Sequence, residues 1–406
     1  MIIRRNRAAV LPALLALALV AAACGSDDDA GSDTGAPTDS AATDSAATDS
    51  GATEGTATDA APVSTGDVDT VGFIFVGPKD DFGYNQAAYA GSEAVKSAFA
   101  DLTVLQAENV PETAESEAVM QDMIDQGADL IFATSFGHLE FAENLAAENP
   151  DVVFVHQGGL ESEPKLDNMG TYFGTVYEPV YTAGIAAGQV SESGTLGYVY
   201  AFPIPQTLAN INAFTLGAQS VNPDIETIAV ATGSWCDPAL QAQAAQTLID
   251  QGADVITQHQ DCTKTIVEAA EAAGVNSVGY HADASELAPN GWITGSEWDW
   301  TALYTDIVQT VIDGTFAESD FNGDYRVGLQ TGANPFVQSA FGAMVAPETI
   351  ELIDAAEASF VAGGSPFTGP VVNQDGDTVW AEGETPTYAD IEQMDFFVDG
   401  VTGSTG

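Results

Sequence analysis

The sequence predicts an α/β fold made of two similar lobes, each built on a doubly wound parallel β-sheet. Residues 123–131 (MIDQGADLI) and 248–256 (LIDQGADVI) are nearly the same. Each segment has the pattern of a helix end, a Gly that stops the helix, and a short apolar strand. A helix that leads into an apolar strand is typical of a parallel sheet covered on both faces. Two such lobes enclose a cleft, where small ligands usually bind.

The N-terminus, residues 1–24, has the layout of a secretory signal peptide. Three Arg residues precede an apolar run at 11–20, and small residues then lead to Cys24. A Cys in this place resembles the lipobox of bacterial lipoproteins, which implies a lipid on Cys24 and an extracytoplasmic protein anchored to the cell membrane. The alternatives are an ordinary cleaved signal with an incidental Cys, or a membrane span, for which the run falls short of about 20 residues.

Residues 25–66 are expected to form a disordered acidic linker. From Gly25 to Pro62 the sequence has no Val, Ile, Leu, Met, Phe, Trp or Tyr. Such a segment cannot bury apolar surface, so it would tether the folded part instead of joining its core.

The chain is strongly acidic, with 8 Lys and Arg against 60 Asp and Glu and a formal net charge of −52. Proteins that bind nucleic-acid backbones need a basic face, so this composition argues against that function. We interpret the charge as a solvated surface that keeps the protein soluble, and a cation-collecting surface is the alternative.

Strands and helices are expected to alternate along the chain. A strand at 71–76 precedes a helix from 84 to about 100 and a strand near 102–106, and further helices and strands follow. In such sheets the loops at the carboxyl ends of the strands build the site. All four histidines of the chain lie in these places: His138, His156, His259 and His281.

Two cysteines remain besides Cys24. Cys236 and Cys262 follow predicted strands at 228–231 and 255–258, and neighbouring parallel strands bring such loops close together. Because thiols outside the cytoplasm often pair, we predict a disulfide between them. Two free thiols are the alternative.

Several segments, taken in order, resemble one protein family. They are DFGYNQAAYAG at 81–91, YTAGIAAG at 181–188, AFPIP at 201–205, SWCDP at 234–238, PFTGP at 366–370 and MDFFVDGV at 394–401. Together they are similar to the basic membrane protein (BMP) family, the substrate-binding lipoproteins of purine and purine-nucleoside ABC importers.

This resemblance implies a type I periplasmic-binding-protein fold, whose two lobes are joined by a three-strand hinge and close on a ligand. The expected first lobe is 67–190 plus 298–322, and the second is 194–296 plus 324–401. The implied partners are a small purine ligand and an ABC permease in the membrane. We expect a monomer without a cofactor.

Members of the family sandwich a purine between one aromatic residue from each lobe. On the matching motifs, Tyr84 with its polar neighbour Asn85 takes the first-lobe place, and Trp235 takes the second-lobe place. A purine stacked on one ring gains about 1 to 3 kcal/mol. Alternatively, Tyr84 and Phe82 fasten the first helix to the sheet, and Asn85 caps that helix.

Phe136 follows a first-lobe strand and is either a ligand contact or part of the core. Asp261 and Asp283 follow second-lobe strands, where a carboxylate can accept a hydrogen bond from a base. His259 is a further candidate in the same group of loops.

The sequence departs from the nucleoside-binding pattern in two places. Trp298 stands where nucleoside binders carry a Lys that holds the ribose, and QHQDC at 258–262 replaces a Gly-rich turn. A site that lacks the ribose-binding cation and has bulkier side chains favours a smaller ligand. We therefore expect a free nucleobase such as adenine, with a nucleoside as the alternative.

Other classes of function remain possible on the sequence. The four histidines with Asp261 or Asp283 could bind a metal, although they are spread over two lobes. An enzyme is disfavoured because the sequence has no Gly-x-Ser-x-Gly, Walker or His-Glu-x-x-His motif. A signalling receptor of the same fold cannot be separated from an importer component.

Overall fold

The computed structural model describes residues 68–330 and 334–405. The expected signal peptide, Cys24 and the expected linker lie outside the described residues. Among the described residues, no helix has the length and apolar character that a bilayer-spanning segment requires.

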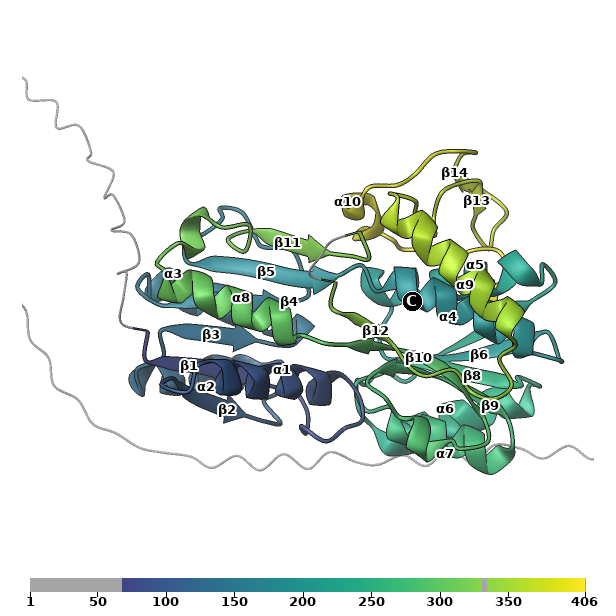
Figure 1. Cartoon of the computed structure of the whole chain (residues 1–406), viewed down its shortest axis with the longest axis horizontal. Helices are drawn as coiled ribbons and strands as arrows, with labels where there is room; N and C mark the ends of the chain where they lie inside the picture. The colour runs from purple at the N-terminus through teal and green to yellow at the C-terminus, as the bar shows by residue number, and fades with distance from the viewer. Residues whose placement is uncertain (1–67, 331–333, 406) are drawn as a thin grey trace, which may run out of the picture. The chain divides into compact units, whose positions relative to one another are not determined.

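The first lobe is built on a parallel sheet with the strand order β11-β5-β4-β3-β1-β2 (Figure 1). Its strands are β1 (Thr70–Ile74), β2 (Thr103–Ala107), β3 (Leu130–Ala133), β4 (Val153–Gln157), β5 (Met169–Gly174) and β11 (Asp324–Val327). Its helices are α1 (Tyr84–Ala98), α2 (Ala114–Asp125), α3 (Leu139–Glu148) and α8 (Thr301–Ile312).

Helices cover both faces of this sheet, α1 and α8 on one side and α2 and α3 on the other. Successive residues of a strand point to opposite faces, and β1 shows the consequence. Phe73 packs in the same apolar cluster as Ala88 of α1 and Tyr304 of α8. Ile74 packs instead with Met120 of α2 and Leu145 of α3. The apolar run of β1 is thus buried on both faces, as predicted for a sheet covered by helices on both sides.

The second lobe has a sheet with the strand order β12-β10-β9-β8-β6-β7-β15, parallel except for β12. Its strands are β6 (Thr195–Tyr200), β7 (Glu226–Ala231), β8 (Val255–His259), β9 (Asn276–His281), β10 (Trp292–Trp298), β12 (Phe336–Gln338) and β15 (Val401–Thr402). Its helices are α4 (Tyr177–Val190), α5 (Pro205–Val221), α6 (Pro238–Asp250), α7 (Lys264–Ala273) and α9 (Pro347–Val361).

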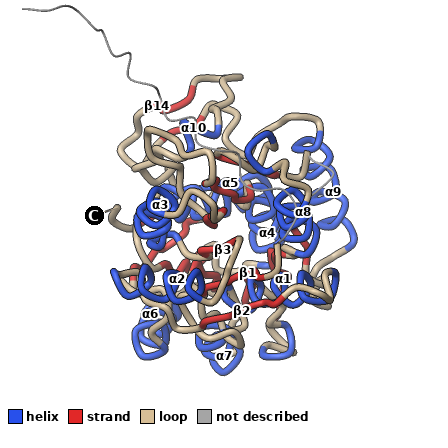
Figure 2. The backbone as a smooth tube through the Cα atoms, turned by 90° about the vertical axis from the view of Figure 1, so that its left-hand side faces the viewer, coloured by secondary structure: helices blue, strands red, loops and turns tan. Residues whose placement is uncertain are grey.

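Short elements complete the chain. They are the 3-10 turns η1 (Phe136–His138), η2 (Ser285–Leu287) and η3 (Phe316–Glu318), the hairpin β13 (Val371–Val372) and β14 (Thr378–Trp380), and α10 (Tyr388–Ile391). In Figure 2 the strands run between helices, so the prediction of two doubly wound parallel sheets is confirmed.

The repeated sequence occupies equivalent places in the two lobes. Residues 123–131 run from the end of α2 into β3, and residues 248–256 run from the end of α6 into β8. Gly127 and Gly252 follow the helix ends with φ of 94° and 95°, a conformation that glycine adopts at little cost. The interpretation of the repeat as a helix-to-strand return is confirmed.

The chain passes between the sheets three times: after β5, after β10 and after β11. Two of these crossings differ from the expected boundaries. β11 pairs with β5, so residues 324–327 belong to the first sheet and not to the second lobe. The chain also leaves the first lobe before α4, and not at residue 190.

Helix α4 belongs to the second lobe because small residues let it approach α5 closely. A Cβ atom on Gly184 would overlap with the carbonyl oxygen of Phe214, and one on Gly217 would overlap with that of Tyr181. α4 is buried over most of its circumference, with α9 covering another side. Its apolar sequence therefore fits a helix enclosed by other helices.

Candidate functional site

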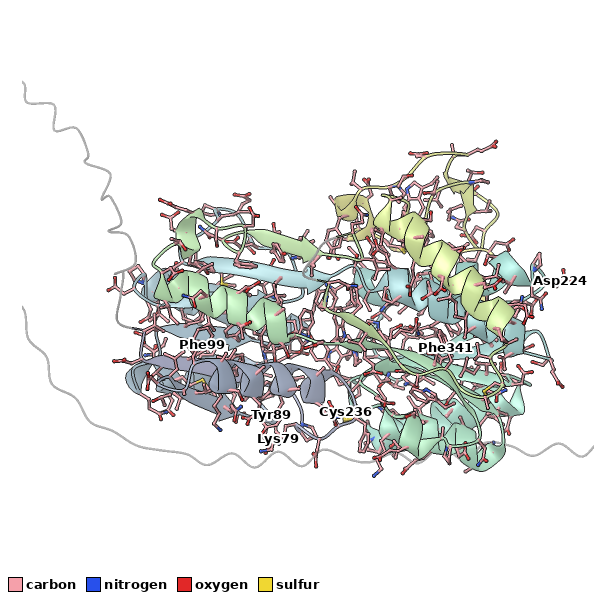
Figure 3. All side chains as sticks on the ribbon, viewed as in Figure 1. Lys79, Tyr89, Phe99, Asp224, Cys236 and Phe341 are labelled. Carbon is pink, nitrogen blue, oxygen red and sulfur yellow. A yellow bond between two sulfur atoms is a disulfide. The ribbon has the colours of Figure 1, made fainter. Side chains whose placement is uncertain are left out.

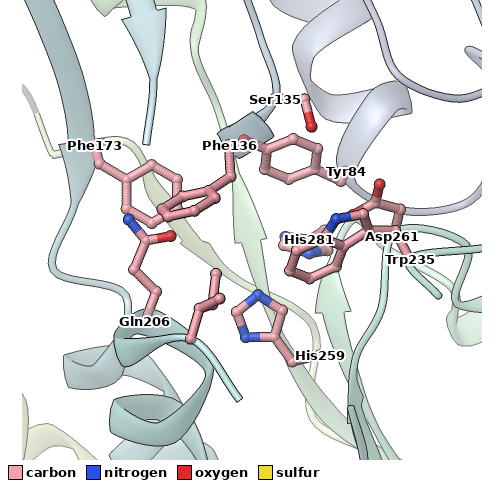
Figure 4. Close-up of a pocket in the computed structure, with 10 residues that line it drawn as sticks. Tyr84, Ser135, Phe136, Phe173, Gln206, Trp235, His259, Asp261 and His281 are labelled. Carbon is pink, nitrogen blue, oxygen red and sulfur yellow. The ribbon is translucent and has the colours of Figure 1, made fainter. Parts of the chain in front are cut away.

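A cavity lies where the carboxyl ends of strands from both sheets face each other (Figure 4). Its empty volume, which includes space open to solvent, is about 310 Å³. Residues from both lobes line it: Tyr84, Ser135, Phe136, Phe173, Ile204, Gln206, Trp235, His259, Asp261 and His281. Open α/β sheets usually bind their ligands at this end of the strands.

Tyr84 is the first residue of α1, and the carboxylate of Asp81 holds this helix start in place. Asp81 accepts hydrogen bonds from the backbone N–H groups of Gly83 at 2.8 Å and of Asn85 and Gln86 at 3.0 Å. The backbone N–H of Tyr84 donates to the carbonyl oxygen of Asp261 in the second lobe at 3.1 Å. The Tyr84 ring therefore enters the cavity at a contact between the lobes.

Trp235 enters from the second lobe, on the loop between β7 and α6. The next residue, Cys236, labelled in Figure 3, forms the predicted disulfide with Cys262, with the Cα atoms 5.2 Å apart. The carbonyl oxygen of Trp235 accepts a hydrogen bond from the backbone N–H of Asp261 at 2.9 Å. These two links fix the loops that follow β7 and β8 to each other.

Glu112, between β2 and α2, contacts Trp235 across the lobes. The indole Nε1 of Trp235 donates to Oε2 of Glu112 at 3.2 Å. The other oxygen, Oε1, accepts from the hydroxyl of Ser135 at 2.7 Å and from the backbone N–H of Gly137 at 2.8 Å. Glu112 thus connects the first-lobe loop that carries Phe136 to the second-lobe ring.

His281, the last residue of β9, is 1% exposed. Its Nδ1 accepts a hydrogen bond from Nε1 of Trp298 at 2.9 Å, and no described residue is a hydrogen-bond partner of its Nε2. Burial, and then the neighbouring His259, lowers the pKa of His281 well below its ordinary value. Burial also lowers the pKa of His259, to about 3. Both imidazoles are therefore neutral near pH 7.

Asp261 is a buried carboxyl beside these rings. Burial, and then the charges of Asp81 and Glu112, raises the pKa of Asp261 well above its ordinary value. Among the described residues, no Lys or Arg lines the cavity to compensate this group. A ligand that donates an N–H to Asp261 would replace part of the hydration that the carboxyl loses on burial.

Five of the nine predicted ligand residues line the cavity: Tyr84, Phe136, Trp235, His259 and Asp261. Phe82 does not, because its ring packs on a second-lobe cluster that includes Trp292. Asn85 does not line it either. Its amide accepts from the backbone N–H of Gly77 at 3.0 Å and donates to Asp81 at 2.8 Å.

Asp283 and Trp298 also lie outside the lining. Asp283 is exposed and accepts a hydrogen bond from the backbone N–H of Ser285 at 2.9 Å. Trp298 lies behind His281 and stacks on Trp300, with ring centroids 4.5 Å apart. Trp298 therefore supports the lining without belonging to it.

The remaining lining residues were not predicted: Ser135, Phe173, Ile204, Gln206 and His281. Ser135 follows β3 and His281 ends β9, so the rule that strand carboxyl ends build the site would have identified both as lining residues. Phe173 lies inside β5 and Gln206 is the second residue of α5, where their residue types suggest core packing and a helix start.

The histidines divide between the two lobes. His138 and His156 are buried in the first lobe, where their Nε2 atoms lie 3.0 Å from the carbonyl oxygen of Val110 and 2.7 Å from that of Ser135. Within residues 68–330 and 334–405, no group of three or more His, Cys, Asp or Glu side chains is placed to hold a metal ion.

Comparison with known proteins shows the family to which the chain is similar. A family model described as "Bmp: ABC transporter substrate-binding protein PnrA-like" matches residues 68–342. A purine-binding protein of Brucella abortus is 36% identical over 334 residues, which are 82% of this chain and 92% of that protein. A putative ABC transporter glucose-binding protein of Haloferax volcanii is 34% identical over 344 residues, 84% of this chain and 82% of that protein.

Solved structures show the same fold. An ABC transporter solute-binding protein from Aeropyrum pernix has a TM-score of 0.65 at 17% identity and covers 80% of this chain and 96% of its own. A transcriptional activator from Bacillus halodurans has a TM-score of 0.62 at 23% identity and covers 73% of this chain and 99% of its own.

Proposed function

The chain belongs to the Bmp family of PnrA-like ABC transporter substrate-binding proteins, and we propose that its ligand is a free purine base such as adenine. Members of this family are binding proteins, not enzymes, and they typically act outside the cytoplasm. The protein therefore captures a solute for an ABC transporter without changing it chemically.

The observation that carries this proposal is the combination of flat rings and polar groups in one cavity. Tyr84 and Phe136 from the first lobe and Trp235 from the second provide faces on which a heterocycle can stack. Asp261 and His281 provide a carboxyl group and an N–H group beside those faces. A purine offers both a π-face and an edge of donors and acceptors, so it uses both features.

The lining also favours a base over a nucleoside. A ribose brings several hydroxyl groups that need buried polar partners, and an unpaired buried polar group costs about 1 to 3 kcal/mol. Beside the two histidines and Asp261, the polar groups of the described lining are those of Ser135 and Gln206, the Tyr84 hydroxyl and the Trp235 indole N–H, which already donates to Glu112. No Lys or Arg of the described residues lies among them to hold a ribose.

Sugar binding is the second candidate, because the Haloferax volcanii relative is named as a putative glucose-binding protein. Aromatic rings can stack on sugars, but a hexose has hydroxyl groups all around its ring. The aromatic faces of Tyr84, Phe136 and Trp235 suit a flat heterocycle better than a hexose, so glucose is the weaker candidate.

The lipid anchor on Cys24, and the signal peptide before it, remain part of the proposal. In this view, the segment 25–66 tethers the lobes near a membrane permease. Expression of the full chain with a radiolabelled fatty acid should label the wild type and leave Cys24→Ala unlabelled. Equal labelling of both would contradict the anchor without affecting the ligand assignment.

The ligand proposal is tested on the purified protein. Native mass spectrometry should find a purine base retained by the wild type, and titration calorimetry should rank adenine, guanine and hypoxanthine above adenosine and glucose. The matched variants are Asp261→Asn and Asp283→Asn, since both carboxylates follow second-lobe strands but only Asp261 lines the cavity. Asp261→Asn should weaken binding by about 5- to 100-fold, and Asp283→Asn should leave it unchanged.

A preference for adenosine or glucose would reject the free base as ligand. Equal effects of the two Asp variants would reject this cavity as the site, even if a purine binds.

A further inference from the structure

We infer that His281 donates a hydrogen bond from its Nε2–H to an acceptor atom of the bound base, and that Trp298 fixes the imidazole tautomer that makes this donation possible. The inference rests on the proposed function for the identity of the ligand. Its structural part concerns the proton on His281 and stands on the geometry around that ring.

The tautomer follows from the chemistry of the two side chains. An indole N–H can only donate a hydrogen bond, so Nδ1 of His281, 2.9 Å from Nε1 of Trp298, must accept with its lone pair. An Nδ1 that accepts carries no proton. Because a neutral imidazole has one proton, that proton lies on Nε2.

A charged imidazolium does not fit this position. It would carry a proton on both nitrogens and would place an N–H against the N–H of Trp298. The ring is also buried, with His259 at a centroid distance of 5.7 Å and Tyr280 at 3.7 Å. Burial and the neighbouring His259 both favour the neutral form.

The Nε2–H is therefore a buried donor with no hydrogen-bond partner among the described residues. Buried donors nearly always have a partner, and His281 lines the cavity. An acceptor on the ligand, such as a ring nitrogen or a carbonyl oxygen of a purine, would satisfy it.

The backbone points to the same conclusion. His281 has a φ of 74°, a left-handed conformation that few residues other than glycine adopt. Residues held in such conformations concentrate at ligand sites. Here the unusual backbone turns the last side chain of β9 between Trp298 and the Tyr84 ring, which lies 5.0 Å away.

Trp298 is thus a positioning residue, and Trp300 provides a matched control. The two indoles stack on each other at 4.5 Å, and Nε1 of Trp300 has no hydrogen-bond partner among the described residues. Replacing either Trp by Phe keeps an aromatic ring in the stack. Only Trp298→Phe removes a hydrogen bond to His281.

The first measurement is the tautomer itself. Long-range ¹⁵N–¹H spectra of the imidazole rings, with the four histidines assigned by single substitutions, should show a proton on Nε2 of His281 in the wild type and in Trp300→Phe. In Trp298→Phe the spectrum should shift toward a mixture of tautomers. A proton on Nδ1 in the wild type, or identical spectra in both Phe variants, would overturn the inference.

The second measurement is binding of adenine and of its 1-, 3- and 7-deaza analogues, each of which lacks one acceptor nitrogen. One analogue should bind the wild type about 10- to 100-fold more weakly than adenine. His281→Leu should bind adenine and that analogue equally. His281→Gln, which keeps an N–H donor, should restore part of the discrimination.

The outcomes separate the two claims. If the wild type binds no purine, the proposed function fails and the ligand part of the inference fails with it, while the spectra still decide the tautomer. If purines bind but His281→Leu discriminates among the analogues as the wild type does, the inference alone is overturned.

Discussion

The indole N–H of Trp235 donates a hydrogen bond to the carboxylate of Glu112, 3.2 Å away, and so joins the second lobe to the first beside the cavity. The same carboxylate holds Ser135 and Gly137, which flank Phe136 in sequence. One residue therefore links a ring of each lobe. Because this contact forms only when the lobes approach, it favours the closed state in which the cavity is complete.

This contact should contribute to ligand affinity. Trp235→Phe keeps a ring but removes the donor, and we expect it to cost about 1 kcal/mol, or roughly fivefold in affinity, since the pair is only partly buried. Glu112→Ala should cost more, because Ser135 and Gly137 also lose their acceptor. Calorimetry on both variants and the double variant measures the coupling. Strictly additive effects would mean that the hydrogen bond does not support closure.

Gly83 should be required for closure. A Cβ atom at this position would overlap with the backbone carbonyl oxygen of Asp261 in the opposite lobe. Gly83→Ala should therefore keep the lobes apart and weaken ligand binding by about tenfold or more, because apparent affinity falls with the population of the competent state. Small-angle X-ray scattering should show no compaction on addition of ligand.

Gly91→Ala is the control for this prediction. Gly91 lies within α1, the helix that Gly83 precedes, but its Cβ would meet the Tyr304 side chain at 2.7 Å inside the first lobe. It should lower the melting temperature and leave ligand-induced compaction intact. Compaction of Gly83→Ala equal to that of the wild type would show that the lobes close in another geometry.

Tyr84 should contribute stacking energy. Tyr84→Leu removes a ring from the cavity and should weaken binding of a purine by about 1 to 3 kcal/mol. Tyr89→Leu, one turn further along α1, is the matched control, since that ring contacts Phe75 and Lys79 and does not line the cavity. Calorimetry should find near wild-type affinity for the control. Equal losses would indicate an effect through helix α1 and not through the ligand.

The sequence predicts the fold well because its signals are local. The segments 123–131 and 248–256 each specify a helix end and a buried strand within nine residues, and the structure has both. The assignment of α4 to a lobe is not local. It depends on the contacts of Gly184 with Phe214 and of Gly217 with Tyr181, which lie 30 and 36 positions apart in the sequence.

The candidate site likewise has residues that local sequence signals predict and residues that they do not. His259 ends β8, and Trp235 and Asp261 lie in the loops that follow β7 and β8, so the rule for strand ends predicts their place in the cavity. Phe173 lies within a strand, and its exposure to the cavity depends on where the chain leaves the first sheet. The sequence predicts Trp298 as a ligand contact, but its ring packs behind His281. Which of the two side chains lies nearer the cavity depends on tertiary packing and cannot be read from their positions in the sequence.

The disulfide Cys236–Cys262 should stabilise the second lobe. It closes a loop with a sequence separation of 26, for which chain entropy gives about 3.5 kcal/mol. A double Cys→Ala variant should unfold at correspondingly lower urea concentration and bind ligand more weakly, because Trp235 precedes Cys236. In a Cys24→Ala variant, alkylation should add mass only after reduction. Alkylation without reduction would show that the two thiols are free.

His156 should make the stability of the first lobe depend on pH. Burial lowers its pKa from 6.5 to about 3, so between these values the unfolded chain binds a proton that the folded protein does not. Stability therefore falls as the pH drops below about 6.5, by roughly 1.4 kcal/mol per pH unit for this group. Above pH 6.5 the imidazole is neutral in both states and the dependence vanishes.

Comparison with His156→Gln isolates this effect. The carboxyls of Asp81 and Asp261, whose pKa values are raised by burial, act in the opposite direction, but they are present in both proteins and cancel in the difference. The variant should have a lower free energy of unfolding than the wild type at pH 7. Urea titrations should show that this difference in free energy becomes smaller toward pH 5. Phe154→Leu, which changes another buried residue of β4, is the control. Its difference in free energy of unfolding from the wild type should be independent of pH. A difference that is independent of pH for His156→Gln as well would mean that His156 takes up a proton in the folded protein as readily as in the unfolded chain.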